Sequence, residues 1–182
     1  MTYIKQNELL LKKLLDFYNV KNNSNMQKML SIINGDSRIS LRIVDWFATN
    51  YAKKHYTVYN LDNDSRFKVY NDYKLNLKAY SKKRFDPFCR WERITIPYLN
   101  NSYIQTTIGQ LNFFKWAIQN KVVQYIEDNY TEIEQDMNGR NSSAKKKTIM
   151  QTNKTRKKRE ELSISATKSI KKEEVEIVVE FN

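Results

Sequence analysis

The stretch TTIGQLNFFKWAIQNKVVQYIEDN, residues 106–129, decides the fold. Apolar residues occupy 11 of its 24 positions, and the polar ones near its middle form a single narrow stripe: Asn112, Lys115 and Gln119. A helix with so little polar surface is buried on most of its sides. Thr107 followed by Gln110 fits the pattern that caps a helix at its start. The stretch therefore predicts one long buried helix on which the rest of the domain packs.

Three segments upstream carry the apolar spacing of amphipathic helices. Residues 8–18 and 24–35 each place apolar side chains on one side, and Gly35 is suited to end the second segment. Residues 36–54 are apolar around most of the circumference and leave one polar stripe: Arg38, Arg42, Asp45 and Thr49. We therefore predict two or three N-terminal helices.

MLSIING-DSRISLRIVDWF, residues 29–47, also has the outline of a helix–turn–helix motif. A helix that reads base edges in a DNA groove needs an exposed polar face. The second segment offers only a narrow stripe, and Asp45 within it would face phosphates. A core helix is therefore the favoured interpretation, and groove reading is the alternative.

The spacing of apolar residues changes in the middle of the chain. HYTVYNL (55–61), RFKVY (66–70), YKLNLKAY (73–80) and ERITIPY (92–98) alternate apolar and polar residues, as strands do. We predict two or three short strands over 56–80 and another over 92–98, ended by Pro97. Together with the helices these make an α+β domain that contains a small antiparallel sheet.

The charge separates the chain into three parts. The net charge is +12, and residues 138–172 carry 12 basic against two acidic residues. That segment is rich in Lys, Ser and Thr and poor in apolar residues, a composition that does not fold. EEVEIVVEFN (173–182) alternates acidic and apolar residues like a strand that adds to a sheet edge. We expect one globular domain over 1–137, a disordered basic arm over 138–172 and a strand-like segment over 173–182.

Residue usage argues against most enzyme classes. The chain has one histidine, His55, one cysteine, Cys89, and three isolated glycines. Zinc sites need about four His, Cys or carboxylate ligands, and phosphate-binding loops need clustered glycines. We therefore expect no enzyme activity, no cofactor and no metal site. No apolar run is long enough to span a membrane, so we also expect no membrane partner.

The stretch KAYSKKRFDPFCRWERITIPY (78–98) mixes cations with aromatic residues, the two ingredients that hold single-stranded nucleic acid. Residues 66–93 carry nine basic against three acidic residues. The candidate phosphate contacts in the folded domain are Lys78, Lys82, Lys83, Arg84, Arg90 and Arg93. The alternative is that the aromatic residues form core while the cations keep the surface soluble.

The arm holds two further basic clusters of the kind that binds nucleic acid non-specifically through counterion release. The candidate contacts there are Lys145, Lys146, Lys147, Arg156, Lys157, Lys158 and Arg159. The alternative is a solvated linker.

SRISLRIVDWFATNYAKK (37–54), FKVYNDYKLNLKAYSKKRFDPFCRWERI (67–94) and TTIGQLNFFKWAI (106–118) resemble an uncharacterised family of small proteins of nucleocytoplasmic large DNA viruses, the giant viruses. The resemblance implies a protein of the infected host cell, located in the cytoplasmic viral factory, the nucleus or the virion. It assigns no catalytic residues.

These observations predict a non-enzymatic nucleic-acid-binding protein that acts in genome packaging or in viral transcription or replication. The alternative is a virion structural or scaffolding protein that tethers neighbouring subunits through its C-terminal arm. In that case residues 174–181 would bind a viral protein partner.

Overall fold

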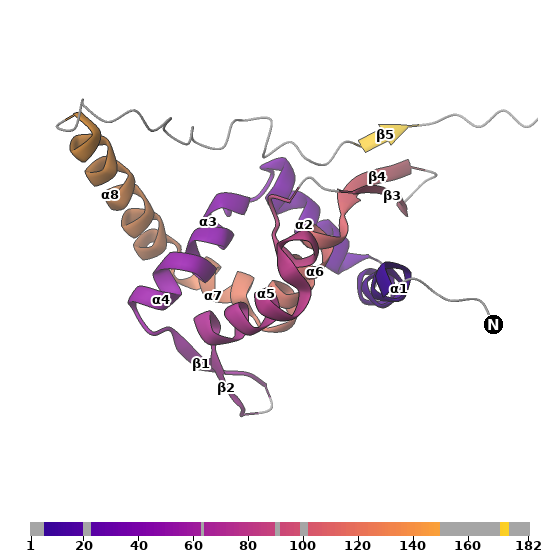
Figure 1. The fold of residues 1–182 in the computed structure, drawn as a ribbon, viewed down its shortest axis with the longest axis horizontal. Helices are drawn as coiled ribbons and strands as arrows, with labels where there is room; N and C mark the ends of the chain where they lie inside the picture. Colours follow the sequence, from indigo (N-terminus) through magenta and orange to yellow (C-terminus); the bar gives the residue numbers. More distant parts are fainter. Residues whose placement is uncertain are drawn as a thin grey trace, which may run out of the picture.

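The computed structural model is α+β, as the sequence predicts (Figure 1). It describes residues 6–19, 23–62, 64–89, 92–98, 102–149 and 172–174, and side chains are described as far as Arg140. The predicted disorder of the basic arm beyond residue 149 stays a prediction, because residues 150–171 lie outside the described part, as do residues 175–182.

Helices α1 (Gln6–Tyr18) and α2 (Ser24–Asn34) confirm the first two predicted helices. Each buries one apolar side, and Gly35 ends α2 in the left-handed conformation with φ 85°. The fully buried Tyr18 donates a hydrogen bond from its hydroxyl to the carbonyl oxygen of Leu111 at 2.7 Å. This bond links α1 to the central helix. An apolar side chain at position 18 could not donate it, so the carbonyl oxygen of Leu111 would have no partner from α1.

The third predicted helix is present but not uniform. It comprises α3 (Leu41–Trp46), a π-helical turn η1 (Phe47–Tyr51) and α4 (Ala52–Lys54). Ser40 caps the start, and its Oγ accepts a hydrogen bond from the backbone N–H of Ile43 at 3.3 Å. The apolar side chains around Phe47 are fully buried, so this helix is a core element.

The strands predicted over 56–80 are only partly correct. β1 (Val58–Asn60) and β2 (Arg66–Lys68) form an antiparallel hairpin, but residues 69–85 form helix α5 (Val69–Phe85). Val69 and Tyr73 are buried one helical turn apart, whereas Leu75, which the strand pattern also counted as apolar, is 66% exposed. The apolar residues of this stretch fit both the two-residue repeat of a strand and the spacing of about 3.6 residues of a helix. Packing against the central helix favours the helix.

The strand predicted over 92–98 is confirmed as β3 (Arg93–Tyr98), although it continues past Pro97. It pairs antiparallel with β4 (Ser102–Thr107), which the sequence analysis missed. Ile96 lies opposite Ile104, and both are buried. β5 (Lys172–Glu174) pairs antiparallel with β4 in the same chain, beside the register positions Ser102–Ile104.

The predicted long central helix is two helices, α6 (Ile108–Gln119) and α7 (Val122–Asp128). Between them Lys121 adopts a left-handed conformation with φ 55°. The break turns the chain so that Val122, Val123 and Ile126 still point into the core, all at most 1% exposed. The cap at the start is confirmed, since Thr107 Oγ1 accepts a hydrogen bond from the backbone N–H of Gln110 at 3.2 Å.

Helix α8 (Tyr130–Ile149) runs through the expected end of the folded domain. The expectation that regular structure stops after Met137 is wrong over 138–149, where the backbone is helical. Ile133 and Met137 are buried one helical turn apart, and they anchor the first half of the helix on the core. No helix in the described part of the chain is both long enough and apolar enough to cross a membrane.

Candidate nucleic-acid interface

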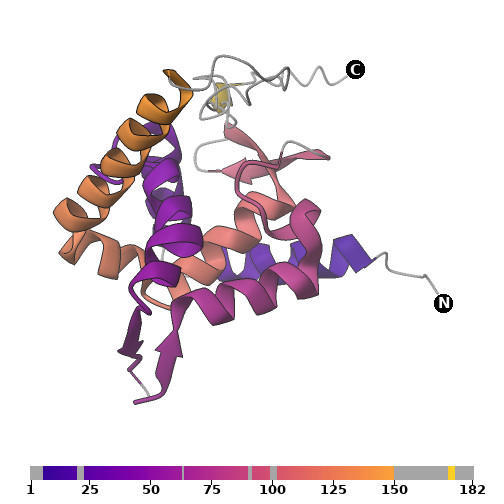
Figure 2. The same cartoon turned by 60° about the vertical axis from the view of Figure 1, so that its left-hand side comes forward.

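Helix α5 carries the densest group of cations in the described body. Figure 2 shows it running along the base of the molecule from the hairpin and then turning sharply. The turn lies at Ser81, whose φ of 63° and ψ of 166° interrupt the helix. Lys74 and Lys78 lie on one side of the long first part, a helical turn apart, and Lys82 follows the kink.

These three lysines are exposed and lack a carboxylate partner. None of them forms an ion pair with any residue in the described part of the chain. An exposed ammonium that is not held by an internal carboxylate is free to contact a phosphate. Lys74 lies outside the predicted stretch 78–98, but the structure places it one helical turn from Lys78 on the same side of α5.

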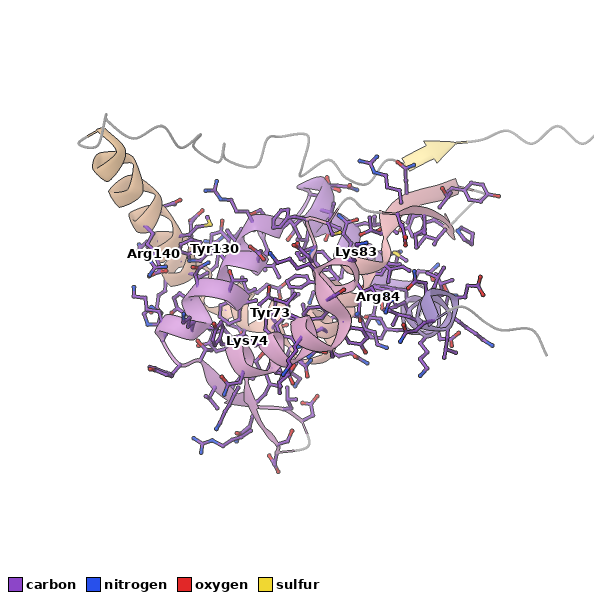
Figure 3. All side chains as sticks on the ribbon, viewed as in Figure 1. Tyr73, Lys74, Lys83, Arg84, Tyr130 and Arg140 are labelled. Carbon is purple, nitrogen blue, oxygen red and sulfur yellow. The ribbon has the colours of Figure 1, made fainter. Side chains whose placement is uncertain are left out.

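The remaining predicted cations of the body lie in different settings. Lys83 is exposed, and Arg84 is half-buried and donates from Nη1 to Gln6 Oε1 at 3.0 Å (Figure 3). Both line a small cavity of about 150 Å³ beside Glu92. Arg93 is exposed on β3 and donates from Nη1 to Gln105 Oε1 at 3.1 Å. Arg90 lies outside the described residues.

The structure therefore gathers four of the six predicted cations on α5 and places Arg93 on the sheet. The position of Lys82, Lys83 and Arg84 in the last turn also has a structural cause, since cations stabilise the negative end of the helix dipole. In the arm, the backbone at Lys145, Lys146 and Lys147 is helical and forms part of α8. Arg156, Lys157, Lys158 and Arg159 lie outside the described residues.

Of the aromatic residues in the stretch 78–98, Phe85 belongs to the core, as the alternative predicted, whereas Tyr80, Phe88 and Tyr98 are half-buried. Phe85 is fully buried, and its ring centroid lies 5.8 Å from those of Phe113 and Trp116. Tyr80 stacks on Phe85 with centroids 6.1 Å apart. Trp91 lies outside the described residues, so its role in stacking stays a prediction.

A second group of surface residues escaped the sequence analysis because it joins two separate segments. Lys53 lies in α4 and Tyr56 comes just after it, while Lys68 and Tyr70 flank the first residue of α5. Together they border a cavity of about 400 Å³. The sequence signal was a lysine close to a tyrosine in both KKHY (53–56) and KVY (68–70).

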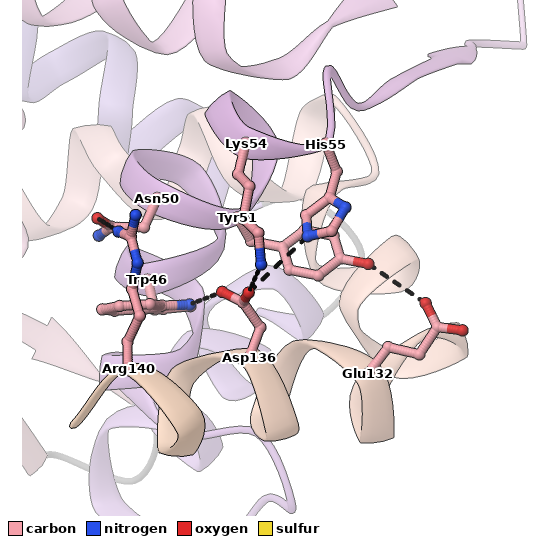
Figure 4. Close-up of polar contacts among 8 residues, drawn as sticks. All are labelled: Trp46, Asn50, Tyr51, Lys54, His55, Glu132, Asp136 and Arg140. Atoms are coloured by element: carbon pink, nitrogen blue, oxygen red, sulfur yellow. Dashed lines mark hydrogen bonds and ion pairs between the residues drawn. The ribbon is translucent and has the colours of Figure 1, made fainter. Parts of the chain in front are cut away.

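The single histidine belongs to a polar cluster that holds α8 against the third helix (Figure 4). Asp136 accepts a hydrogen bond from Trp46 Nε1 at 3.1 Å and pairs with Lys54 Nζ. His55 Nε2 lies 3.8 Å from the same carboxylate. Burial acts to raise the pKa of Asp136, but the hydrogen bonds from Lys54 and Trp46 and the nearby positive charges outweigh it and lower the pKa.

Further contacts between α8 and the third helix explain the direction in which α8 runs. Tyr51 donates to Glu132 Oε2 at 3.3 Å, and its ring stacks on His55 with centroids 4.2 Å apart. Arg140 donates from Nη1 to Asn50 Oδ1 at 3.3 Å. These bonds hold the first half of α8 against the third helix. They therefore set the direction in which the lysine-rich second half of α8 extends from the body.

One half-buried carboxyl stands out electrostatically. Burial, and then repulsion from Asp86, raise the pKa of Asp45 to about 7. Asp45 belongs to the polar stripe for which groove reading was the alternative. Asp45 itself is half-buried, and its neighbours Val44 and Phe47 are fully buried, which supports the core-helix interpretation of this segment.

Comparison with known proteins gives the family. Residues 2–181 match a family described as a family of unknown function, DUF7197. The protein named "Uncharacterized protein L507" of Acanthamoeba polyphaga mimivirus is 49% identical over 117 residues, which cover 60% of this chain and 45% of that protein. The match thus spans less than half of the relative's length. No solved structure matches. A giant-virus relative confirms the resemblance inferred from the sequence, and the chain belongs to DUF7197.

Proposed function

We propose that this protein is a non-enzymatic nucleic-acid-binding protein of a large DNA virus, acting in genome packaging or in viral transcription or replication. The observation that carries the proposal is the group of exposed lysines on α5, with Lys74 and Lys78 a helical turn apart and Lys82 beyond the kink at Ser81; none of the three has a carboxylate partner among the described residues. The net charge of +12 supports a polyanionic partner. Infected-cell cytoplasm, nucleus and virion are the compartments that this role implies.

The proposed contacts are to phosphates, so binding is non-specific. Lysine is a flexible point charge that neutralises a phosphate without reading a base. The arm clusters Lys145–Lys147 and Arg156–Arg159 would add further phosphate contacts. Each contact releases counterions, and the logarithm of the affinity therefore falls linearly with the logarithm of the salt concentration.

The test is binding of single- and double-stranded oligonucleotides by the full chain across a salt series. In the variant K74Q/K78Q two phosphate contacts are lost. The slope should then shrink by about 1.8 on duplex and about 1.4 on single strands, at about 0.9 and 0.7 per contact. The matched control is K12Q/K13Q, which removes the same charge from the exposed side of α1. The arm variant K145Q/K146Q/K147Q measures the contribution of α8.

Equal losses in K74Q/K78Q and K12Q/K13Q would show that only the net charge matters, and would contradict an interface on α5. Absence of binding by the unmodified chain at moderate salt would contradict the whole proposal. The scaffolding alternative then becomes the leading hypothesis. The pairing of β5 with β4 is relevant to the scaffolding alternative. A strand that pairs within one chain is one that the same strand of a neighbouring subunit could replace.

A further inference from the structure

The cavity that joins α4, the hairpin and the start of α5 has the size of a small-ligand site. Its volume is about 400 Å³, within the range of roughly 300–1,000 Å³ that such sites occupy. Figure 1 shows α4, β1, β2 and the start of α5 together at one end of the body. The lining residues that matter chemically are Lys53, Tyr56, Thr57, Lys68, Tyr70 and Asn71.

One wall of the cavity is positively charged. It contains the N-terminal turn of α5, where Lys68 occupies the cap position and no side chain caps the helix. The N–H of Val69 donates to the carbonyl oxygen of Thr57, but the remaining N–H groups of the first turn and the helix dipole make such an end favourable for an anion. Lys53 and Lys68 add two ammonium groups, and neither forms an ion pair with a described residue.

The acidic residue in the first turn of α5 does not cancel this charge. Asp72 is absent from the lining of the cavity. Its Oδ1 accepts hydrogen bonds from Trp116 Nε1 at 2.6 Å and from Asn76 Nδ2 at 2.9 Å, on the side of α5 that faces α6.

Thr57 supplies an independent sign of a missing ligand. Its side chain is 7% exposed, and Oγ1 has no hydrogen-bond partner among the described residues. Its backbone is satisfied, since the carbonyl oxygen accepts from the N–H of Val69 at 3.3 Å. A buried hydroxyl without a partner is costly, and such groups in native structures are usually satisfied by something bound.

The other walls are aromatic. Tyr56 is 86% exposed and has φ 48°, an unusual conformation for a bulky residue. Tyr70 is half-buried, and the ammonium groups of Lys53 and Lys74 each lie 5.7 Å from its ring centroid. An aromatic face beside cations suits a flat base attached to a phosphate.

We propose that this cavity binds one phosphorylated nucleoside, with its phosphate at the start of α5 between Lys53 and Lys68 and its base against Tyr56 or Tyr70. The Thr57 hydroxyl donates a hydrogen bond to the bound group. The nucleoside comes either from a nucleic-acid strand that continues along Lys74 and Lys78 or from a free nucleotide. The inference rests on the proposed function in the first case and is independent of it in the second.

The experiment is calorimetric titration of the full chain with four probes. These are AMP, adenosine, inorganic phosphate, and an eight-nucleotide single strand that carries a 5′-phosphate. We expect AMP or the oligonucleotide to bind, and adenosine and phosphate to bind far more weakly. Preference for the oligonucleotide identifies a strand as the source, and equal binding of AMP identifies a free nucleotide. Phosphate binding as tightly as either would overturn the inference, because the base would then contribute nothing.

Two variants test the residues. Y56A should weaken binding by roughly five- to a hundred-fold, as loss of a stacking partner does. T57V should weaken binding by about three- to tenfold through the lost hydrogen bond, while the free protein becomes no less stable because an unpartnered hydroxyl has gone. T57S keeps the hydroxyl and should bind like the unmodified chain. A T57V protein that binds normally, or a T57S protein that fails with T57V, would overturn the assignment of Thr57.

L75A is the matched control for Y56A, since Leu75 is exposed on α5 and does not line the cavity. The two proposals fail differently. If K74Q/K78Q weakens oligonucleotide binding while Y56A and T57V leave it and AMP binding unchanged, the interface on α5 stands and the cavity inference is overturned. If AMP binds and responds to T57V while no strand binds at moderate salt, the cavity stands and the proposed function fails.

Discussion

The two ends of α5 each combine lysines with aromatic residues but are held very differently. At the C-terminal end Phe85 is fully buried, and the carbonyl oxygen of Arg84 accepts a hydrogen bond from Asn112 Nδ2 at 2.9 Å. At the N-terminal end Tyr56 is exposed and the Thr57 hydroxyl has no partner among the described residues. The difference teaches that a cluster of basic and aromatic residues is not one functional unit. The unpartnered hydroxyl of Thr57 lies at the N-terminal end, while the other buried side-chain atom without a partner among the described residues, Asn7 Oδ1, belongs to a residue that lines the small cavity beside Lys83 and Arg84.

The largest expected effect contrasts the aromatic residues of the two ends. F85A should lower the free energy of unfolding by about 3–5 kcal/mol, because it empties a core site among Tyr73, Phe113 and Trp116. Y56A should change it by less than about 0.5 kcal/mol, as surface substitutions do. Urea unfolding followed by circular dichroism measures both. Similar losses in the two variants would break the comparison.

The next effect concerns pH and the half-buried carboxyl beside the C-terminal end. Because the folded pKa of Asp45 is raised to about 7, the folded protein retains a proton that the unfolded chain loses near pH 4. Stability should therefore fall as pH rises from about 4 to about 7, by on the order of 2–4 kcal/mol. Above pH 7 this contribution is constant.

D45N removes that titration. The difference in unfolding free energy between the unmodified protein and D45N, measured from pH 4 to pH 8, should change across the window in favour of D45N. A difference that is flat with pH would show that Asp45 titrates normally, and that the C-terminal end of α5 is not packed against a desolvated acid.

A third effect tests how closely the end of α5 approaches the central helix. A Cβ at Gly109 would lie 2.8 Å from the carbonyl oxygen of Asp86 and 3.2 Å from that of Lys83. G109A should therefore cost about 1–3 kcal/mol of stability through overpacking. The matched control is G139A in α8, where an added Cβ meets nothing within 4 Å. It should stabilise by up to about 1 kcal/mol through helix propensity. Thermal unfolding distinguishes the two signs.

The smallest effect contrasts two adjacent lysines near the open end. Lys54 pairs with Asp136, while Lys53 lines the cavity. Lys54 is half-exposed, so K54Q should cost only about 0.5–1 kcal/mol of stability and leave ligand binding unchanged. K53Q should leave stability unchanged and weaken binding of AMP or the oligonucleotide. Reversal of these two results would show that the positive wall of the cavity has a structural role.

The sequence was most informative where local chemistry and packing agree. The Thr107 cap, the glycine that ends α2 and the apolar density of 106–129 were predicted correctly for this reason. Lys121 was not, because lysine has no intrinsic preference for the left-handed conformation and only the surrounding core imposes it. For α5, the alternating pattern of 73–80 fitted a strand equally well, and the contact with α6 decided the outcome.

The candidate site was only partly predictable for a related reason. Basic clusters are visible in a sequence, and Lys78, Lys82, Lys83 and Arg84 were found from their proximity along the chain. The cavity depends on Lys53 and Tyr70 meeting across a hairpin, and on a threonine hydroxyl that lacks a partner. Neither property is a feature of composition or period.

The π-helical turn at Phe47–Tyr51 has a consequence for how the family can vary. Trp46 and Lys54 both reach Asp136, although they are eight residues apart. In a regular α-helix that separation leaves two side chains about 80° apart around the axis, at about 100° per residue. The extra residue of a π-helical turn returns them to within about 20°. The length of the third helix therefore indicates how α8 is held. A homologue with one residue fewer in this helix would not place both side chains at Asp136, so it would need another contact to hold α8.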